Sequence, residues 1–170
     1  MTSIAIVGAG PQLGLAIART FGSHGFDVAL VSRNRDKLDQ LVGTLTAEGV
    51  SAAAFPADVL DRGALTQALK DAATRFGGID VLEYSPVGTI GSTTLTTPTA
   101  TQPSDVQHEM EFQHKELDGT GIQAAHVGID VSIGMSVVPG FPTAQPEEIS
   151  PVYWDLHTTR RDQAELVFSR

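Results

Sequence analysis

The sequence predicts an α/β protein, a parallel sheet with helices on both faces that is shortened in its second half. Three observations lead to this fold class. Short aliphatic runs alternate with stretches whose apolar residues recur at helical spacing through the first half of the chain. The aliphatic runs are apolar throughout, which is typical of strands covered on both faces. Glycines follow the helical stretches and mark where they end.

The first half is expected to hold four strands separated by three helices. The strands span residues 3–7, 27–31, 51–57 and 79–84, and the helices span residues 12–24, 35–48 and 62–76. Each helix carries an apolar face that should pack on the sheet. The face of the first helix consists of Leu13, Ile17 and Phe21, that of the second of Leu38, Leu41, Val42 and Leu45, and that of the third of Leu65, Ala68, Leu69 and Ala72. Crossover helices of this kind connect parallel strands.

The pattern is looser after Pro86. A loop-rich stretch is expected at residues 86–103, followed by a helix at 104–117 and a strand at 122–133. A further loop at residues 134–146 leads to a C-terminal helical segment at 146–168. No internal repeat or linker divides the chain, so residues 1–170 are expected to form a single domain.

Composition and charge exclude several classes of protein. The net charge of −9 argues against a nucleic-acid partner, because phosphate binding needs a basic face. The chain contains no cysteine, which excludes disulfides and thiolate chemistry. No stretch is long and apolar enough to cross a membrane, and the N-terminus lacks the features of a signal peptide, so a cytoplasmic location is expected. The five histidines lack the spacing of a metal site, and no metal is expected.

The most informative motif is the glycine-rich turn between the first strand and the first helix. Gly8, Gly10 and Gly14 stand there together with Gln12 and Leu13. Glycines let the backbone approach a pyrophosphate, and a helix N-terminus offers free N–H groups to it, so these five residues are predicted to bind a dinucleotide. The alternative is that the glycines only form a tight turn.

Ser32 and Arg33 follow the second strand, where a dinucleotide fold meets the adenosine ribose. An acidic residue there would bind a free 2′-hydroxyl, whereas an arginine suits a 2′-phosphate. The strand end carries no Asp or Glu, so NADP is favoured as the cofactor, with NAD as the alternative. A solvated arginine at a helix start remains the competing interpretation.

Two further strand ends carry candidate cofactor contacts. After the third strand, Asp58 could accept a hydrogen bond from the adenine amino group, with Val59 beside it. The alternative is that Asp58 caps the next helix, a role for which Asp61 is also a candidate. After the fourth strand, Ser85 and Pro86 either border the cofactor ribose or simply turn the chain.

These residues together resemble the short-chain dehydrogenase/reductase family. The family's Thr-Gly-x-x-x-Gly-x-Gly turn is similar to residues 9–16, with alanine in place of its threonine and last glycine, and Asp58-Val59 matches the family's adenine-contacting pair. The resemblance is close from residue 1 to about residue 84. It implies a Rossmann-like dinucleotide-binding domain and an NADP(H)-dependent oxidoreductase acting on a small-molecule carbonyl or alcohol.

The second half departs from the family pattern. The family's catalytic Tyr-x-x-x-Lys does not occur in the sequence. By comparison with the family, the chain is expected to pass from one helix to the next near Gln113 and His114 without the strand between them. The catalytic residues are therefore unknown. The alternative function is a shortened, inactive relative that binds nucleotide or a protein partner without turnover. Because a missing strand exposes sheet edges and apolar helix faces, a homo-oligomer is also expected.

Overall fold

The computed structural model describes residues 2–85, 123, 125–136, 139–159 and 163–170. The chain divides into two compact units, residues 1–87 and 88–170. The helix expected at residues 104–117 and the loop-rich stretch at 86–103 lie outside the described residues. The single domain expected over residues 1–170 stays a prediction.

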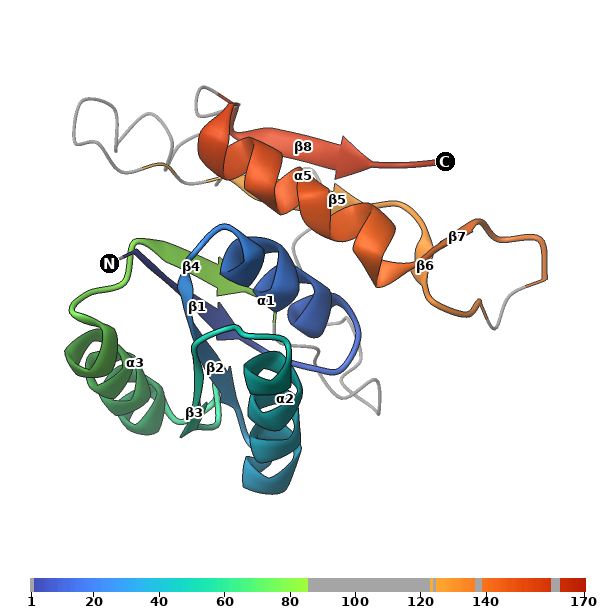
Figure 1. Cartoon of the computed structure of the whole chain (residues 1–170). Helices are drawn as coiled ribbons and strands as arrows, with labels where there is room; N and C mark the ends of the chain where they lie inside the picture. The colour runs from blue at the N-terminus through green and yellow to red at the C-terminus, as the bar shows by residue number, and fades with distance from the viewer. Residues whose placement is uncertain (1, 86–122, 124, 137–138, 160–162) are drawn as a thin grey trace. The chain divides into compact units, whose positions relative to one another are not determined.

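The first unit alternates strands and helices in the order that the sequence predicts (Figure 1). Its elements are β1 Ser3–Val7, α1 Leu13–Ser23, β2 Asp27–Ser32, α2 Arg35–Ala47, β3 Ala52–Pro56, α3 Arg62–Phe76 and β4 Val81–Tyr84. The strands form one parallel sheet in the order β3-β2-β1-β4. The α/β fold class is confirmed, and the predicted element bounds of this half are correct to within two residues.

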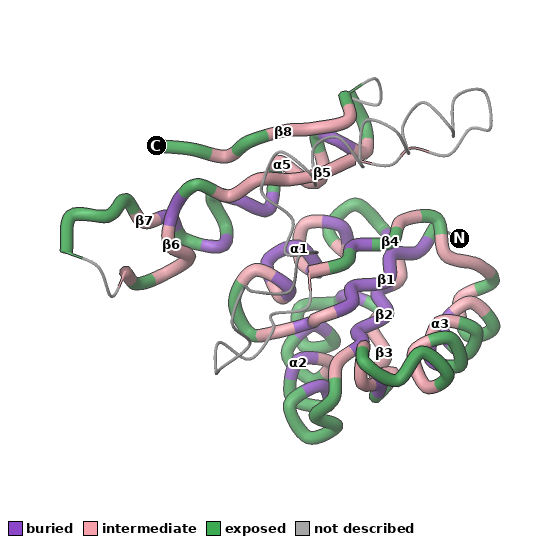
Figure 2. Tube along the Cα trace, turned by 180° about the vertical axis from the view of Figure 1, so that it is seen from behind, coloured by how far each residue is buried: buried purple, intermediate pink, exposed green. Residues whose placement is uncertain are grey.

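The core of the first unit lies on both faces of β1 and β2. Every residue of β1 is buried, as are the four central residues of β2 (Figure 2). On one face, Ala68 and Ala72 of α3 pack against small and β-branched residues of the sheet. On the other face, α1 and α2 bury Ile17, Phe21, Leu38, Leu41 and Leu45. These helix residues are those that the periodicity places inward.

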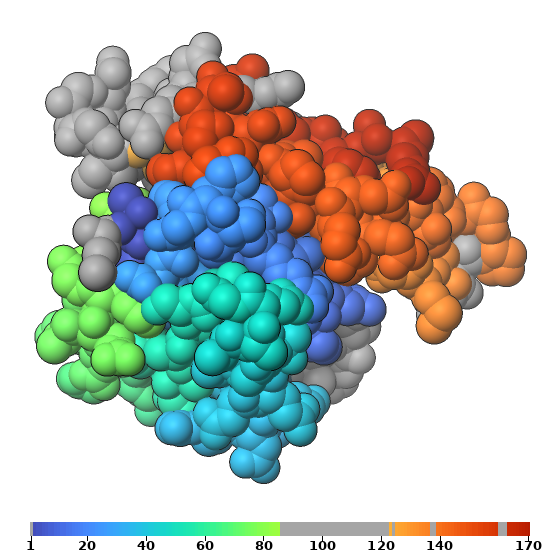
Figure 3. Space-filling model, viewed as in Figure 1, coloured from blue at the N-terminus to red at the C-terminus, as the bar shows by residue number. Residues whose placement is uncertain are grey.

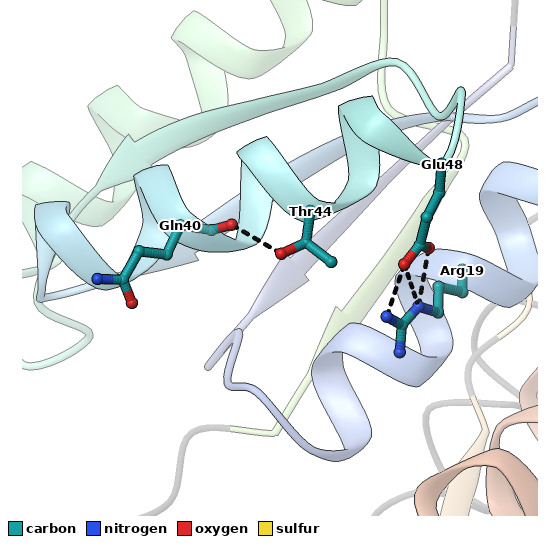
Figure 4. A network of polar contacts seen from close by, with 4 residues as sticks. All are labelled: Arg19, Gln40, Thr44 and Glu48. Atoms are coloured by element: carbon teal, nitrogen blue, oxygen red, sulfur yellow. Dashed lines mark hydrogen bonds and ion pairs between the residues drawn. The ribbon is translucent and has the colours of Figure 1, made fainter.

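Helices α1 and α2 lie next to each other on one face of the unit (Figure 3). Arg19 of α1 and Glu48, which follows α2, form a two-pronged ion pair with N–O distances between 2.7 and 3.1 Å (Figure 4). The hydrogen bond from Arg19 holds the pKa of the Glu48 carboxyl below its usual value. The pair joins the two helices at an exposed position, where such contacts are screened by water.

Side chains cap two of the helices in this unit. Asn34 Oδ1 accepts a hydrogen bond from the Lys37 N–H at 2.9 Å, and Asp61 Oδ1 accepts one from the Ala64 N–H at 2.9 Å. The predicted cap at Asp61 is therefore confirmed. At the other end of α3, Gly77 has a φ of 83°, the left-handed conformation that ends many helices.

The described residues of the second unit form two short parallel pairings and one helix. Its elements are β5 His126–Ile129, β6 Ser132–Ile133, β7 Thr143–Ala144, α5 Pro146–Thr158 and β8 Glu165–Phe168. Strand β5 pairs with β8, and β6 pairs with β7. Helix α5 begins with a capping box, in which the Gln145 N–H donates to the Glu148 carboxylate at 2.7 Å. Among the described residues, no helix combines the length and apolar character needed to span a membrane.

The second unit corrects three sequence predictions. The helix expected over residues 146–168 ends at Thr158, and residues 165–168 form strand β8 instead, because they pair with β5 some 40 positions away. The single strand expected over 122–133 is divided: the Asp130 N–H donates to Phe168 O, whereas the Ser132 N–H donates to Pro142 O. That change of partner also places a short strand, β7, in the expected loop at 134–146.

Candidate functional site

The candidate site follows from the parallel order of the first sheet. Because all four strands run the same way, their carboxyl ends lie at one edge, where α/β proteins bind ligands. The described residues that the sequence singled out follow or end these strands: Gly8, Gly10, Gln12, Leu13 and Gly14 after β1, Ser32 and Arg33 at β2, Asp58 and Val59 after β3, and Ser85 after β4. Pro86 lies outside the described residues.

The glycine turn is anchored to the neighbouring strand by its own backbone. The N–H groups of Gly8 and Ala9 both donate to the carbonyl oxygen of Val31, at 2.9 and 3.1 Å. Gly8 has a φ of 97°, a conformation that residues with a side chain rarely adopt. The turn therefore leaves β1 in a fixed direction and leads into α1.

The N-terminus of α1 has no side-chain cap. Gln12 occupies the cap position with φ −101° and ψ −108°, and its side chain makes no capping hydrogen bond. The first backbone hydrogen bonds here run from Leu15 N to Gly10 O at 3.0 Å and from Ala16 N to Gln12 O at 3.1 Å. The N–H groups before Leu15 have no partner in this helix, which suits an anion at this end.

Gly14 brings the helix close to the turn. A Cβ atom added to Gly14 would lie 3.2 Å from Ala9 Cα and 3.8 Å from Ile6 Cγ2, so a side chain there would press on the turn's backbone. Gly14 is buried, as close packing of helix and strand requires. This is the packing role that the last glycine of a dinucleotide turn has.

At the end of β2, Arg33 is exposed while its neighbours are engaged locally. Ser32 is half-buried and its carbonyl oxygen accepts the Ala57 N–H at 3.0 Å. Asn34 caps α2, and Arg35 makes an ion pair with Asp39 at 3.1 Å. Arg33 thus lies one residue before the cap of α2, and no acidic residue stands at the strand end.

At the end of β3, the two predicted contacts have different surroundings. Asp58 does not cap α3, because Asp61 does; its Oδ1 accepts the Leu60 N–H at 3.0 Å and closes a small turn. Val59 packs against the buried cluster that contains Val7 and Val31. Asp58 is therefore a half-buried residue at the sheet edge, whereas Val59 is part of the packing around the core.

At the end of β4, the structure reveals a residue that the sequence analysis missed. Glu83 is 7% exposed, and burial raises the pKa of its carboxyl to about 7, against the opposing effect of a side-chain hydrogen bond with Ser85. The Ser85 N–H donates to Val7 O at 2.9 Å. The available signal was an acidic residue within the otherwise apolar run at 79–84.

A family model described as short chain dehydrogenase matches residues 2–132. The chain belongs to the short-chain dehydrogenase family. The match includes the glycine turn, the four strand ends and the whole first unit, so the resemblance stated from the motifs is confirmed. It also extends beyond residue 84, to which the motifs alone had limited the close resemblance.

The curated relatives that the chain matches are longer than the chain itself. A 2,3-dihydro-2,3-dihydroxybenzoate dehydrogenase of Bacillus subtilis is 43% identical over 77 residues, which cover 45% of this chain and 30% of the relative. An uncharacterized oxidoreductase of Mycobacterium tuberculosis is 34% identical over 133 residues, which cover 78% of this chain and 49% of the relative. The chain thus spans half the length of these relatives or less.

Solved structures agree with the fold. A hydroxysteroid dehydrogenase from Escherichia coli has a TM-score of 0.82 at 17% identity, with 99% of this chain and 95% of that chain covered. A metagenomic short-chain oxidoreductase in complex with NADP has a TM-score of 0.74 at 19% identity, with 98% and 96% covered. At these identities the likeness concerns the fold alone.

Proposed function

We propose that this short-chain dehydrogenase binds NADP(H) at the glycine turn and takes part in hydride transfer to or from a small carbonyl or alcohol. The observation that carries the proposal is the N-terminus of α1, which begins behind Gly8, Gly10 and Gly14 without a side-chain cap. When bound, the dinucleotide supplies the hydride, and the residues of the chain hold and orient it. The backbone N–H groups at the start of α1 would hold the pyrophosphate.

Gly10 favours a ligand site over a purely structural turn. Position 8 requires a glycine because its φ is positive, and position 14 requires one because a Cβ there would press on Ala9. Gly10 has neither constraint: its φ is not positive, and an added Cβ would meet only Gly8 O, at an ordinary 3.9 Å. A ligand that approaches the backbone closely gives this position a reason to lack a side chain.

The test of this site is the variant Gly10→Val. Because an added Cβ would meet only Gly8 O, at 3.9 Å, the urea midpoint should stay near that of the unchanged protein, whereas NADPH affinity should fall by at least tenfold. Cofactor fluorescence measures the affinity, and circular dichroism measures unfolding. Unchanged NADPH affinity would show that the turn is structural only.

The preference for NADP over NAD rests on Arg33. Its exposed guanidinium follows β2, and a planar guanidinium can bind a phosphate through two parallel hydrogen bonds. Arg33→Asp should therefore weaken NADPH far more than NADH. Arg35→Asp is the matched control, since it makes the same change of charge two positions away at a side chain already paired with Asp39. Equal losses for both cofactors in Arg33→Asp would contradict the preference.

The reaction needs its own measurement, because the sequence contains no Tyr-x-x-x-Lys. Relatives that are a dehydrogenase and an oxidoreductase support dehydrogenase chemistry, and an assay with NADPH and a panel of aldehydes, ketones and quinones tests it. Turnover that is lost in Tyr84→Phe or Tyr153→Phe would identify the proton donor. NADPH binding without turnover on any substrate would replace the oxidoreductase with a nucleotide-binding relative.

Two further expectations belong to this proposal. The first is a cytoplasmic location, which fractionation of cells that produce the protein would test. Self-association is supported by Leu82 and Tyr84, which are 54% and 59% exposed on the same face of β4. Sedimentation of the purified chain would measure the oligomeric state directly.

A further inference from the structure

Glu83 lies inside the protein on strand β4. Its neighbours along the strand, Leu82 and Tyr84, are 54% and 59% exposed, whereas Glu83 is 7% exposed. Because side chains alternate along a strand, Glu83 points to the opposite face of the sheet from these two. It is in register with Ile6 of β1, on the face that α1 covers at Gly14.

The described residues around Glu83 in the first unit provide no charge to balance a carboxylate. Its Oε2 atom has no hydrogen-bond partner among the described residues. Strand β1 carries no ionisable side chain, and α1 carries a single one, Arg19, which is bound to Glu48. His24, just beyond α1, is engaged with the carbonyl oxygen of Thr20. A buried carboxyl group without a cation favours its neutral form.

Glu83 is also connected to the glycine turn. The Ser85 side chain interacts with the Glu83 carboxyl and opposes the rise of its pKa, and the Ser85 N–H donates to Val7 O at 2.9 Å. Val7 precedes Gly8, the first residue of the turn. The end of β4, the end of β1 and the turn thus form one continuous set of contacts, with Glu83 at its buried side.

We infer that Glu83 is protonated in the folded chain, and that its ionisation as the pH rises weakens the attachment of the end of β4 to β1 beside the glycine turn. A second consequence rests on the proposed function: NADPH affinity should decline over the same pH range. Burial raises the pKa of Glu83 to about 7, and this sets the direction in which stability changes with pH. The protonated group stabilises the fold fully below the ordinary value of 4.5, and this stability is lost as the pH rises through about 7.

The first experiment compares unfolding in urea from pH 5 to pH 8.5 for the unchanged chain and for Glu83→Gln, which carries a neutral group of the same shape. The ratio of their unfolding equilibrium constants should change by up to about tenfold per pH unit between the two pKa values, because one proton is involved. Asp71→Asn, an exposed acid on α3, is the control and should leave the pH profile unchanged. Parallel profiles for the unchanged chain and Glu83→Gln would overturn the inference.

A direct titration covers the case in which Glu83→Gln does not fold. Carbon NMR of the unchanged chain with labelled glutamate side chains should show a carboxyl that titrates near pH 7. If every glutamate titrates at its ordinary value, the inference is wrong.

The cofactor arm measures NADPH affinity by fluorescence over the same pH range. Affinity that falls as the pH rises in the unchanged chain, but falls less in Glu83→Gln, supports the second consequence. An identical pH dependence in both proteins refutes that consequence. If NADPH does not bind at any pH, the proposed function fails, and the unfolding and NMR results still decide the protonation of Glu83.

Discussion

Replacing Gly22 by alanine should test how closely α1 packs on the segment after α2. A Cβ atom on Gly22 would lie 2.4 Å from Val50 Cγ1, 2.8 Å from Cγ2 and 3.1 Å from Cβ. Rotation of the valine cannot relieve these contacts, because both methyl groups and the branching carbon are involved. The Val50 backbone is held as well, by a hydrogen bond from its N–H to Leu45 O at 2.9 Å.

The expected magnitude is the difference of two effects. Alanine is favoured over glycine within a helix by about 1 kcal/mol. Forcing an extra methyl group into a filled site costs about 1–3 kcal/mol. Gly22→Ala should therefore lower the free energy of unfolding by up to about 2 kcal/mol, since the packing cost exceeds the gain in helix propensity.

Gly43→Ala is the matched control. Gly43 lies within α2, is exposed, and has nothing within 4 Å of an added Cβ. This variant should stabilise the protein by about 0.5–1 kcal/mol, so the difference between the two variants isolates the contact with Val50. Urea unfolding followed by circular dichroism gives both values, with an unchanged denaturant slope.

Two results would refute this reasoning. One is a Gly22→Ala protein as stable as Gly43→Ala. The other comes from the double variant Gly22→Ala with Val50→Ala, in which the clash has been removed. It should be less destabilised than the sum of the two single changes by about 1 kcal/mol or more, and simple additivity would mean that the residues are not in contact.

Three other outcomes are expected. Gly14→Ala should weaken NADPH binding by more than its effect on the urea midpoint explains, and a loss confined to stability would count against the pyrophosphate site. Asp61→Ala should cost about 1 kcal/mol of folding free energy in urea, while Asp61→Asn should cost little, because both Asp and Asn cap helices. The Arg19–Glu48 pair should stabilise the fold at pH values above the ordinary glutamate pKa, and this stability should be lost as the pH falls through the lowered pKa of Glu48. Glu48→Gln should therefore make the thermal midpoint less sensitive to acid at low salt. Equal acid profiles for the two proteins would show that the pair adds no stability.

The sequence predicts the first unit well because its signals there are local. The apolar period of α1, the cap at Asp61 and the glycines that end the helices each act within a few residues. The strands of this unit are short apolar runs between such helices, so their parallel order follows from the connections. The glycine turn was identified for the same reason, since strand, turn and helix are contiguous.

The second unit was predicted less well because its strands depend on distant partners. Leu166 and Val167 have a spacing that also suits the end of a helix, and only the parallel pairing with β5 decides that they form a strand. Asp130 and Ser132 are two residues apart, yet their N–H groups donate to different strands. No local signal states which partner a short apolar run will find.

By itself, the sequence determined the α/β class, the first seven elements and the family to which the glycine turn belongs. The tertiary structure decided the environment of individual side chains. No backbone angle or close contact requires a glycine at position 10, and Arg33 is exposed just before α2. Glu83 is buried without a balancing charge among the described residues of the first unit. The physical reason is that burial and charge balance depend on residues brought together by folding, whereas periodicity and turns are properties of neighbours along the chain.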